Sequence, residues 1–170
     1  MNAQHWPADS VERRPIAELI PFAGNSREHT DAQVAQIAAS MREFGWTVPV
    51  LVDEDGTIIA GHGRILAAQL LGWSEAPVMI ARGWSNAQKR AYCIIDNKLP
   101  ENAEWNTEML AVEIDGLRDL EFNIGLLGFA RAELNDLIGT PNSAPDTKEE
   151  QASTLTCPNC GHEFTPAAAA

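Results

Sequence analysis

The stretch TIIAGHGRILAAQLLG, residues 57–72, decides the fold, because a β-branched apolar run passes through a Gly-x-Gly-Arg turn into a helical pattern. Gly61 and Gly63 permit backbone angles that a side chain would forbid, and they let a ligand approach the chain closely. The first free N–H groups of a helix point outward from such a turn, and Arg64 adds a charged fork beside them. The turn therefore indicates either a phosphate site or a tight strand-to-helix connection that needs glycine for steric reasons alone.

Length and composition are those of a globular protein. The 170 residues suffice for one domain with a real core, and 45% of them are hydrophobic. No apolar run approaches the roughly 20 residues that span a bilayer, and residues 1–15 lack the basic-then-apolar order of a signal peptide. Three unevenly spaced cysteines are too few for a disulfide framework. We therefore expect a cytoplasmic protein without membrane contact.

Periodicity and turn residues predict the order of the elements. Thr30 and Gln33 have capping-box spacing before a helix that ends at Gly45, and Ser85 with Gln88 repeats that spacing. Two β-branched runs around Asp55-Gly56 predict a hairpin with strands at 48–52 and 57–60. The other expected elements are an extended segment at 16–22, a strand at 77–81, and helices at 64–71, 89–99, 108–120 and 131–139.

Composition divides the chain into segments. They are an N-terminal tail (1–14), an α/β domain (15–100), an acidic helical extension (101–139), a flexible linker (140–155), a knuckle-like stretch CPNCGHEF within 156–164, and a last tail (165–170).

The net charge of −12 is unevenly spread along the chain. Residues 1–100 hold 11 acids and 9 bases, whereas residues 101–150 hold 12 acids and 3 bases. Because gripping duplex DNA requires a surplus of Lys and Arg, we expect no strong DNA binding by the chain alone. A local group of cations still offers partners for phosphate, namely Arg27, Arg64, Arg82, Lys89, Arg90 and Lys98.

Taken with its surroundings, the Gly61–Arg64 box resembles that of the ParB/sulfiredoxin superfamily. An arginine-containing loop, a helix ending in Gly, a hairpin, the box, a strand and a helix with an acid-amide pair follow one another as in the N-terminal domain of ParB-type proteins. AGHGR, DNKL and LLGF (126–129) together resemble the ParB-like segments that precede site-specific DNA methyltransferases in phages and mobile elements. The resemblance covers roughly residues 15–100. It implies an α/β (α+β) fold, with a small mixed sheet flanked by helices and a C-terminal helical extension.

The resemblance also implies a nucleotide site. ParB proteins hold CTP and its magnesium ion with the box and a Glu-Asn pair. The corresponding residues for nucleotide phosphate are Arg27, Gly61, His62, Gly63, Arg64 and Asn97, with Asp96 as the Mg²⁺ ligand through the nucleotide. His62, Gly63 and Leu66 stand where the family has an acid and two arginines. Because two phosphate-binding charges of the family are absent, the resemblance does not single out CTP, and the nucleotide expected is CTP or ATP with Mg²⁺. The expected role is a phosphate-binding accessory of DNA modification or partition, with a DNA methyltransferase or another DNA-processing protein as partner.

Other interpretations stay open at this point. The chain is alternatively a Mg²⁺-dependent NTPase or ParB-like nuclease, with His62 as a candidate catalytic base, or a non-catalytic interaction domain. His62 alternatively bonds the neighbouring loop, and Asp96-Asn97 alternatively caps a helix. Sulfiredoxin chemistry is excluded, because the box holds no cysteine and Cys93 falls in an apolar helical segment. We expect no helix-turn-helix segment after residue 100, because residues 106–139 are short and acidic.

The C-terminal CPNCGH stretch has the turn of a zinc knuckle. Cys157, Cys160 and His162 supply at most three ligands, whereas structural zinc takes four. A complete site needs a second chain or a partner, which makes a homodimer possible. The alternative is a degenerate half of a zinc ribbon that binds no metal.

Overall fold

The structure is a computed structural model, and it describes residues 7–139, 155–156 and 163–164. The chain divides into two compact units: Met1–Asn106 with Phe122–Gly128, and Thr107–Glu121 with Phe129–Ala170. Within the described ranges, no helix combines the length and apolar character that crossing a bilayer requires.

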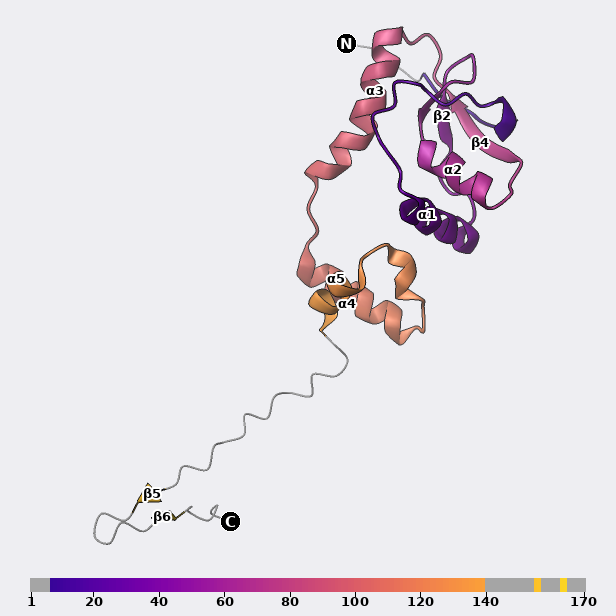
Figure 1. Cartoon of the computed structure of the whole chain (residues 1–170). Helices are drawn as coiled ribbons and strands as arrows, with labels where there is room; N and C mark the ends of the chain where they lie inside the picture. Colours follow the sequence, from indigo (N-terminus) through magenta and orange to yellow (C-terminus); the bar gives the residue numbers. More distant parts are fainter. Residues whose placement is uncertain (1–6, 140–154, 157–162, 165–170) are drawn as a thin grey trace. The chain divides into compact units, whose positions relative to one another are not determined.

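The first unit is built on a four-stranded mixed sheet in the order β1-β4-β2-β3 (Figure 1). Its strands are β1 (Val11–Pro15), β2 (Val50–Val52), β3 (Ile58–Ala60) and β4 (Glu75–Ile80). β4 pairs antiparallel with β1 and parallel with β2, and β2 pairs antiparallel with β3. The parallel pair needs a crossover, and the helix of the box supplies it.

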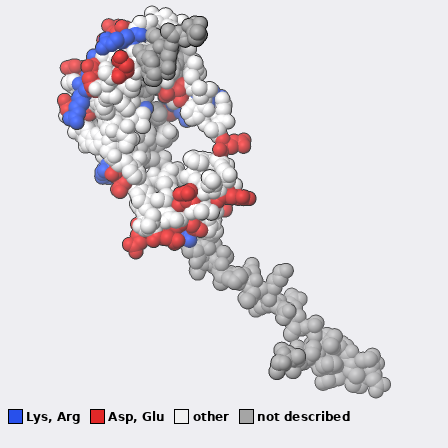
Figure 2. All heavy atoms as spheres, turned by 180° about the vertical axis from the view of Figure 1, so that it is seen from behind, with Lys and Arg blue, Asp and Glu red and all other residues white. Residues whose placement is uncertain are grey.

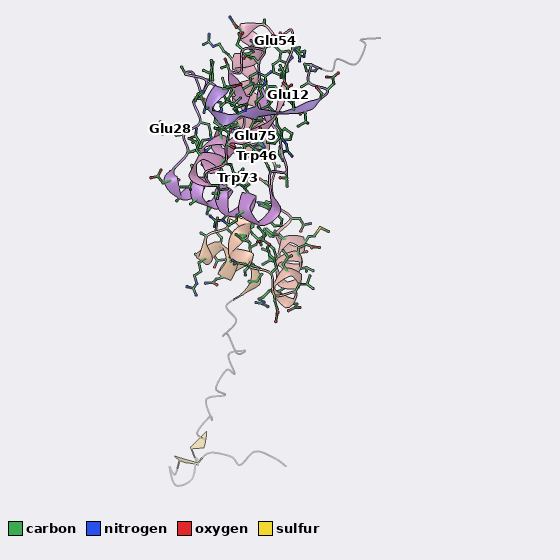
Figure 3. All side chains as sticks on the ribbon, turned by 90° about the vertical axis from the view of Figure 1, so that its right-hand side faces the viewer. Glu12, Glu28, Trp46, Glu54, Trp73 and Glu75 are labelled. Carbon is green, nitrogen blue, oxygen red and sulfur yellow. The ribbon has the colours of Figure 1, made fainter. Side chains whose placement is uncertain are left out.

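Helices α1 (Asp31–Phe44) and α2 (His62–Leu70) pack against each other and cover one face of the sheet. The strand side chains of this core are fully buried, and Ala67 and Ala68 of α2 are 0% exposed against them. These two small residues let α2 come close to the sheet. Trp46 and Trp73 lie side by side at the edge of this core, with ring centroids 5.9 Å apart (Figure 3).

Helix α3 (Asn86–Lys98) covers the opposite face of the sheet. Because successive strand side chains point to opposite faces, the strands also present apolar side chains to α3. Ile59 points away from the first core and packs with Cys93 of α3. The Ser85–Gln88 capping box that starts α3 is formed in both directions. A 3₁₀ turn, η2 (Leu99–Asn102), follows α3.

A buried carboxylate fastens the β2–β3 hairpin to α3. Asp53 is 5% exposed, and its Oδ1 accepts hydrogen bonds from the backbone N–H groups of Asp55 and Thr57 at 3.0 and 2.8 Å. Lys89 of α3 donates to Oδ2 at 2.8 Å. Burial raises the pKa of Asp53, but the hydrogen bonds from Lys89 and the backbone outweigh it and lower the pKa below its usual value.

The second unit contains α4 (Thr107–Asp119) and α5 (Arg131–Ile138), which pack together around Ile114 and Leu134. Its short strands β5 (Leu155–Thr156) and β6 (Glu163–Phe164) pair antiparallel. The intervening 3₁₀ turn η3 (Ile124–Leu127) belongs to the first unit. Phe122 stacks there on Phe44 of α1, with ring centroids 6.0 Å apart.

The predicted fold class is confirmed, with differences at particular elements. Residues 11–14, assigned to the N-terminal tail, form most of the edge strand β1. The extended segment expected at 16–22 begins instead with a 3₁₀ turn, η1 (Ile16–Glu18), because Ile16 and Leu19 turn inward to the core. Helix α2 starts at His62 rather than 64, since Gly61 in the left-handed region is its N-cap.

Candidate functional site

One cavity of about 170 Å³ in the first unit brings the predicted nucleotide residues together. We call it the box cavity. The predicted residues in its lining are Arg27, Gly61, His62, Gly63, Arg64, Asp96 and Asn97. Asn25, His29 and Ile37 complete the lining.

The box turn shows why glycine is needed at each of its two positions. Gly61 has φ +99°, and a Cβ there would lie 3.2 Å from both Nε and Nη2 of Arg64. Glycine therefore lets the guanidinium fold back over the turn. At Gly63 the requirement is packing, because a Cβ would lie 3.0 Å from His29 Cε1 and from Ile37 Cδ1.

Arg64 brings a partly desolvated cation to the cavity. Its side chain is half-buried, and Nη1 donates to the carbonyl oxygen of Val48 at 3.2 Å. Burial lowers the pKa of Arg64 and the carboxylate of Asp96 raises it, yet a guanidinium stays charged at any physiological pH. A cation that has lost part of its hydration gains most from an anion beside it.

Arg27 is held in a polar loop and is paired to η2. Asn25 brackets its backbone, accepting from Arg27 N at 3.2 Å and donating to Arg27 O at 3.1 Å. The guanidinium donates from Nη1 to Glu101 Oε1 at 2.6 Å. Lys98 also donates to Glu101, at 3.1 Å, and these bonds from Lys98 and Arg27 lower the pKa of Glu101.

Asp96 and Asn97 lie within the last full turn of α3 and do not cap it. The helix continues to Lys98, and the C-cap is Leu99, so the capping interpretation is wrong. Asn97 donates from Nδ2 to the carbonyl oxygen of Cys93 at 2.8 Å. The carboxylate of Asp96 and the amide oxygen of Asn97 are of the kind that Mg²⁺ takes as ligands. No cluster of three or more metal-binding side chains occurs in the described ranges, so an ion at Asp96 would need oxygens from a bound phosphate as well.

His62 has a backbone partner. Its Nε2 accepts from the N–H of Phe22 at 3.4 Å, which leaves the ring proton on Nδ1. Burial lowers the pKa of His62, and the positive charge of a protonated His29 lowers it further. The neutral ring therefore accepts a hydrogen bond that holds the loop, as expected in the sequence interpretation in which His62 bonds the neighbouring loop.

A second cavity, of about 380 Å³, adjoins the box cavity and shares Arg64 and Asp96 with it. Trp84 and Tyr92 form part of its wall, with ring centroids 5.1 Å apart. Its other walls are mainly apolar, which suits a flat ring system rather than phosphate.

The remaining sequence candidates fall elsewhere. Lys89 and Lys98 are engaged by Asp53 and Glu101. The larger cavity beside Asp53, of about 470 Å³, is lined by this Asp53–Lys89 pair and also by Asp55 and Arg90. Cys93 is 7% exposed, and burial raises the pKa of its thiol, as a structural cysteine requires. The zinc candidates Cys157, Cys160 and His162 lie outside the described residues.

Sequence reasoning missed Asn25 and His29. Both come from the loop that carries Arg27, and polar residues two positions away from a candidate cation were the available signal. The contact between His29 and Gly63 joins residues far apart in the chain, and nothing in the local pattern predicts it.

Family models match both parts of the chain. The model of the ParB N-terminal domain matches residues 2–98, and that of the ParB-methyltransferase HTH domain matches residues 108–158. The second match overturns the expectation that no helix-turn-helix segment follows residue 100. That expectation relied on charge and length, whereas the motif is defined by how helices such as α4 and α5 pack. The expected lack of strong DNA binding loses its support with it.

Similar proteins include partition and nucleoid occlusion proteins. The chain is 51% identical over 77 residues to the ParB-like nuclease domain-containing protein YnaK of Escherichia coli K12, covering 45% of this chain and 88% of YnaK. It is 32% identical over 149 residues to the probable chromosome 2-partitioning protein ParB of Deinococcus radiodurans, covering 85% and 48%. It is 29% identical over 117 residues to the nucleoid occlusion protein of Halalkalibacterium halodurans, covering 64% and 41%. The chain thus spans less than half the length of the last two relatives.

Among solved structures, the fold is similar to that of the C-terminally truncated chromosome-partitioning protein ParB from Caulobacter crescentus complexed with CTP-γ-S. The TM-score is 0.63 at 23% identity, covering 76% of this chain and 77% of that one. At this identity the likeness establishes the fold.

Proposed function

The chain belongs to the ParB N-terminal domain family, and we propose that its first unit binds a nucleoside triphosphate with Mg²⁺ in the box cavity, as an accessory of DNA partition or modification. The observation that carries the proposal is the convergence of Arg27, Arg64 and the glycine turn at the start of α2 on one cavity. Free N–H groups at a helix start and guanidinium forks are the groups that bind phosphate chains.

The division of the site into two cavities supports a nucleotide rather than free phosphate. Arg64 and Asp96 line both cavities, so a ligand whose phosphates reach the box turn can place its base near Trp84 and Tyr92. Asp96 and Asn97 would hold the Mg²⁺ that bridges the phosphates. If Arg64, Asp96 and Asn97 pointed away from one another, a pure interaction domain would be favoured instead.

The second unit supplies the proposed link to DNA. The helix-turn-helix match covers α4 and α5, and the similar proteins include a partition protein and a nucleoid occlusion protein. We therefore propose that the first unit responds to the nucleotide and that residues 108–158 contact DNA. A DNA methyltransferase or another DNA-processing protein remains the proposed partner.

Calorimetric titration with CTP, ATP, GTP and UTP in the presence of Mg²⁺ tests the proposal. Arg64→Ala should weaken binding by about 1.5 to 3 kcal/mol, because it removes a charge-assisted contact. Arg42→Ala is the matched control, since it removes an exposed arginine of α1 that does not line the cavity. The proposal is wrong if the wild type binds none of the four nucleotides, or if both variants lose affinity equally.

A further inference from the structure

His29 occupies the space that a side chain at position 63 would fill. A Cβ at Gly63 would lie 3.0 Å from Cε1 and 3.2 Å from Nδ1 of the imidazole. The glycine therefore lets the ring of His29 stand against the first turn of α2, where helix N–H groups favour an anion. Gly63 has no side chain at this point of the box, and an imidazole from the loop before α1 lies against it instead.

Gln33 fixes the orientation and the first proton of this ring. His29 Nδ1 lies 2.9 Å from Gln33 Oε1, and an amide oxygen can only accept, so Nδ1 carries hydrogen. Gln33 is itself anchored at the start of α1, where its N–H donates to Thr30 Oγ1 at 3.2 Å. Nε2 then holds either a lone pair or a second proton, and only the protonated form can donate to an anion.

The charges around His29 permit the second proton when an anion is bound. The charged and titratable groups that share the cavity are Arg27 of the loop, His62 and Arg64 of α2, and Asp96 of α3. Glu101 balances Arg27, and His62 stays neutral because its Nε2 accepts from the backbone. A phosphate chain adds several negative charges beside the ring, which favours the imidazolium.

We propose that His29 is a phosphate-binding residue of the box cavity, which joins the site as an imidazolium and so makes phosphate binding take up a proton from solvent. Nε2–H donates to a phosphate oxygen while Nδ1–H continues to donate to Gln33. The inference rests on the proposed function of the same cavity. In this assignment His29 supplies a positive charge beside Gly63, which has no side chain to supply one.

Titration with inorganic tripolyphosphate tests this assignment, because that probe has no base and reports on the phosphate contacts alone. His29→Phe keeps a ring against Gly63 and removes both nitrogen donors, whereas His29→Arg supplies a permanent charge. Glu28→Gln is the matched control, since it raises the net charge at an exposed neighbouring residue outside the cavity. Circular dichroism of each variant checks that it is folded.

At about pH 6, where an imidazole readily takes a second proton, His29→Phe should bind tripolyphosphate about tenfold or more weakly than the wild type. At about pH 8 the difference should shrink to about threefold or less, and His29→Arg should bind well at both values. The probe titrates in the same pH range, but comparing variants at one pH removes its own contribution.

Two results would overturn the assignment and are told apart by the wild type. Equal binding of wild type and His29→Phe at about pH 6, with Arg64→Ala still impaired, contradicts the role of His29 and leaves the phosphate site intact. A wild type that binds neither tripolyphosphate nor any nucleotide contradicts the proposed function and this inference together.

Discussion

His62 Nε2 accepts a hydrogen bond from the backbone N–H of Phe22 at 3.4 Å, so the first residue of α2 ties the box to the segment that follows η1. The acceptor nitrogen must be unprotonated, and burial lowers the pKa of His62 accordingly. A histidine placed in the box thus fixes the neighbouring loop, and its contribution to stability depends on pH.

We expect the free energy of unfolding to fall as pH drops below about 6.5, the pKa of an unperturbed histidine. In that range the unfolded chain takes up a proton that folded His62 resists, and the loss levels off below the lowered folded pKa. The effect should be ~0.5 kcal/mol, because the ring is half-buried and water screens it. Urea unfolding at about pH 7.5 and 5.5 measures it. His62→Gln should remove this part of the pH dependence, and an unchanged dependence would contradict the prediction.

Asp53 should matter for stability through its hydrogen bonds to the hairpin. Asp53→Ala leaves the N–H groups of Asp55 and Thr57 without their acceptor and should lower the free energy of unfolding by about 2 kcal/mol. Asp53→Asn keeps an acceptor oxygen and should cost less. Glu54→Ala, a substitution at the neighbouring carboxylate, is the control. Equal losses from Asp53→Ala and Glu54→Ala in thermal unfolding would refute the assigned role.

Local signals in the sequence were sufficient for most elements of this fold. Thr30 and Ser85 cap α1 and α3 as predicted, because a cap depends on residues within one turn. β1 escaped prediction, since Glu12, Arg13 and Arg14 are polar and the strand exists through its pairing with β4. An edge strand that buries little leaves no hydrophobic pattern to detect.

The same distinction separates the predicted from the missed parts of the site. Arg64 and its glycines form one local motif, and the structure places them in one cavity with Asp96 and Asn97. The Arg27–Glu101 ion pair and the contact of His29 with Gly63 depend on tertiary packing. No spacing rule within one helix or strand reports such contacts.

Glu101 should compete with phosphate for Arg27. Because its carboxylate lies 2.6 Å from the guanidinium, a bound anion must share or displace it. Glu101→Gln should strengthen tripolyphosphate binding about two- to fivefold, a small effect because both side chains are 44% exposed and water screens the pair. Glu104→Gln makes the same change of charge at another exposed acid. Weaker binding by Glu101→Gln, or equal gains in the two variants, would argue against competition.

The C-terminal stretch remains a predicted zinc site. Two chains side by side offer four thiolates from Cys157 and Cys160, so we expect about one ion per two chains. Metal content by mass spectrometry and molar mass with and without chelator measure this, and Cys157→Ser with Cys160→Ser should abolish binding. The first unit should stay folded when metal is removed, because its described residues form no metal cluster. A preparation that cannot be loaded with zinc, or a molar mass that ignores chelator, would contradict the prediction.

Binding of duplex DNA through the helix-turn-helix region should have an unusually shallow dependence on salt. Most Lys and Arg side chains in view lie over the first unit, whereas the charged side chains in view over the α4–α5 unit are mostly acids (Figure 2). Residues 108–158 contain three bases, Arg118, Arg131 and Lys148, and Arg118 is already paired with Asp115 at 2.8 Å. Since each neutralised phosphate contributes about −0.9 to the slope of log affinity against log salt, three bases limit the slope to about −3.

Fluorescence anisotropy of the full chain with duplex DNA over a range of salt concentrations measures this slope. Arg131, the exposed first residue of α5, forms no ion pair with another described residue, so Arg131→Ala should reduce the slope by about 1. Arg42→Ala, on α1 of the first unit, should leave the slope unchanged. A slope near −6 or steeper, or equal losses in the two variants, would mean that bases of the first unit contact the phosphates. The acidic second unit would then contact base edges or a partner, and it would not supply the electrostatic contacts to the phosphates.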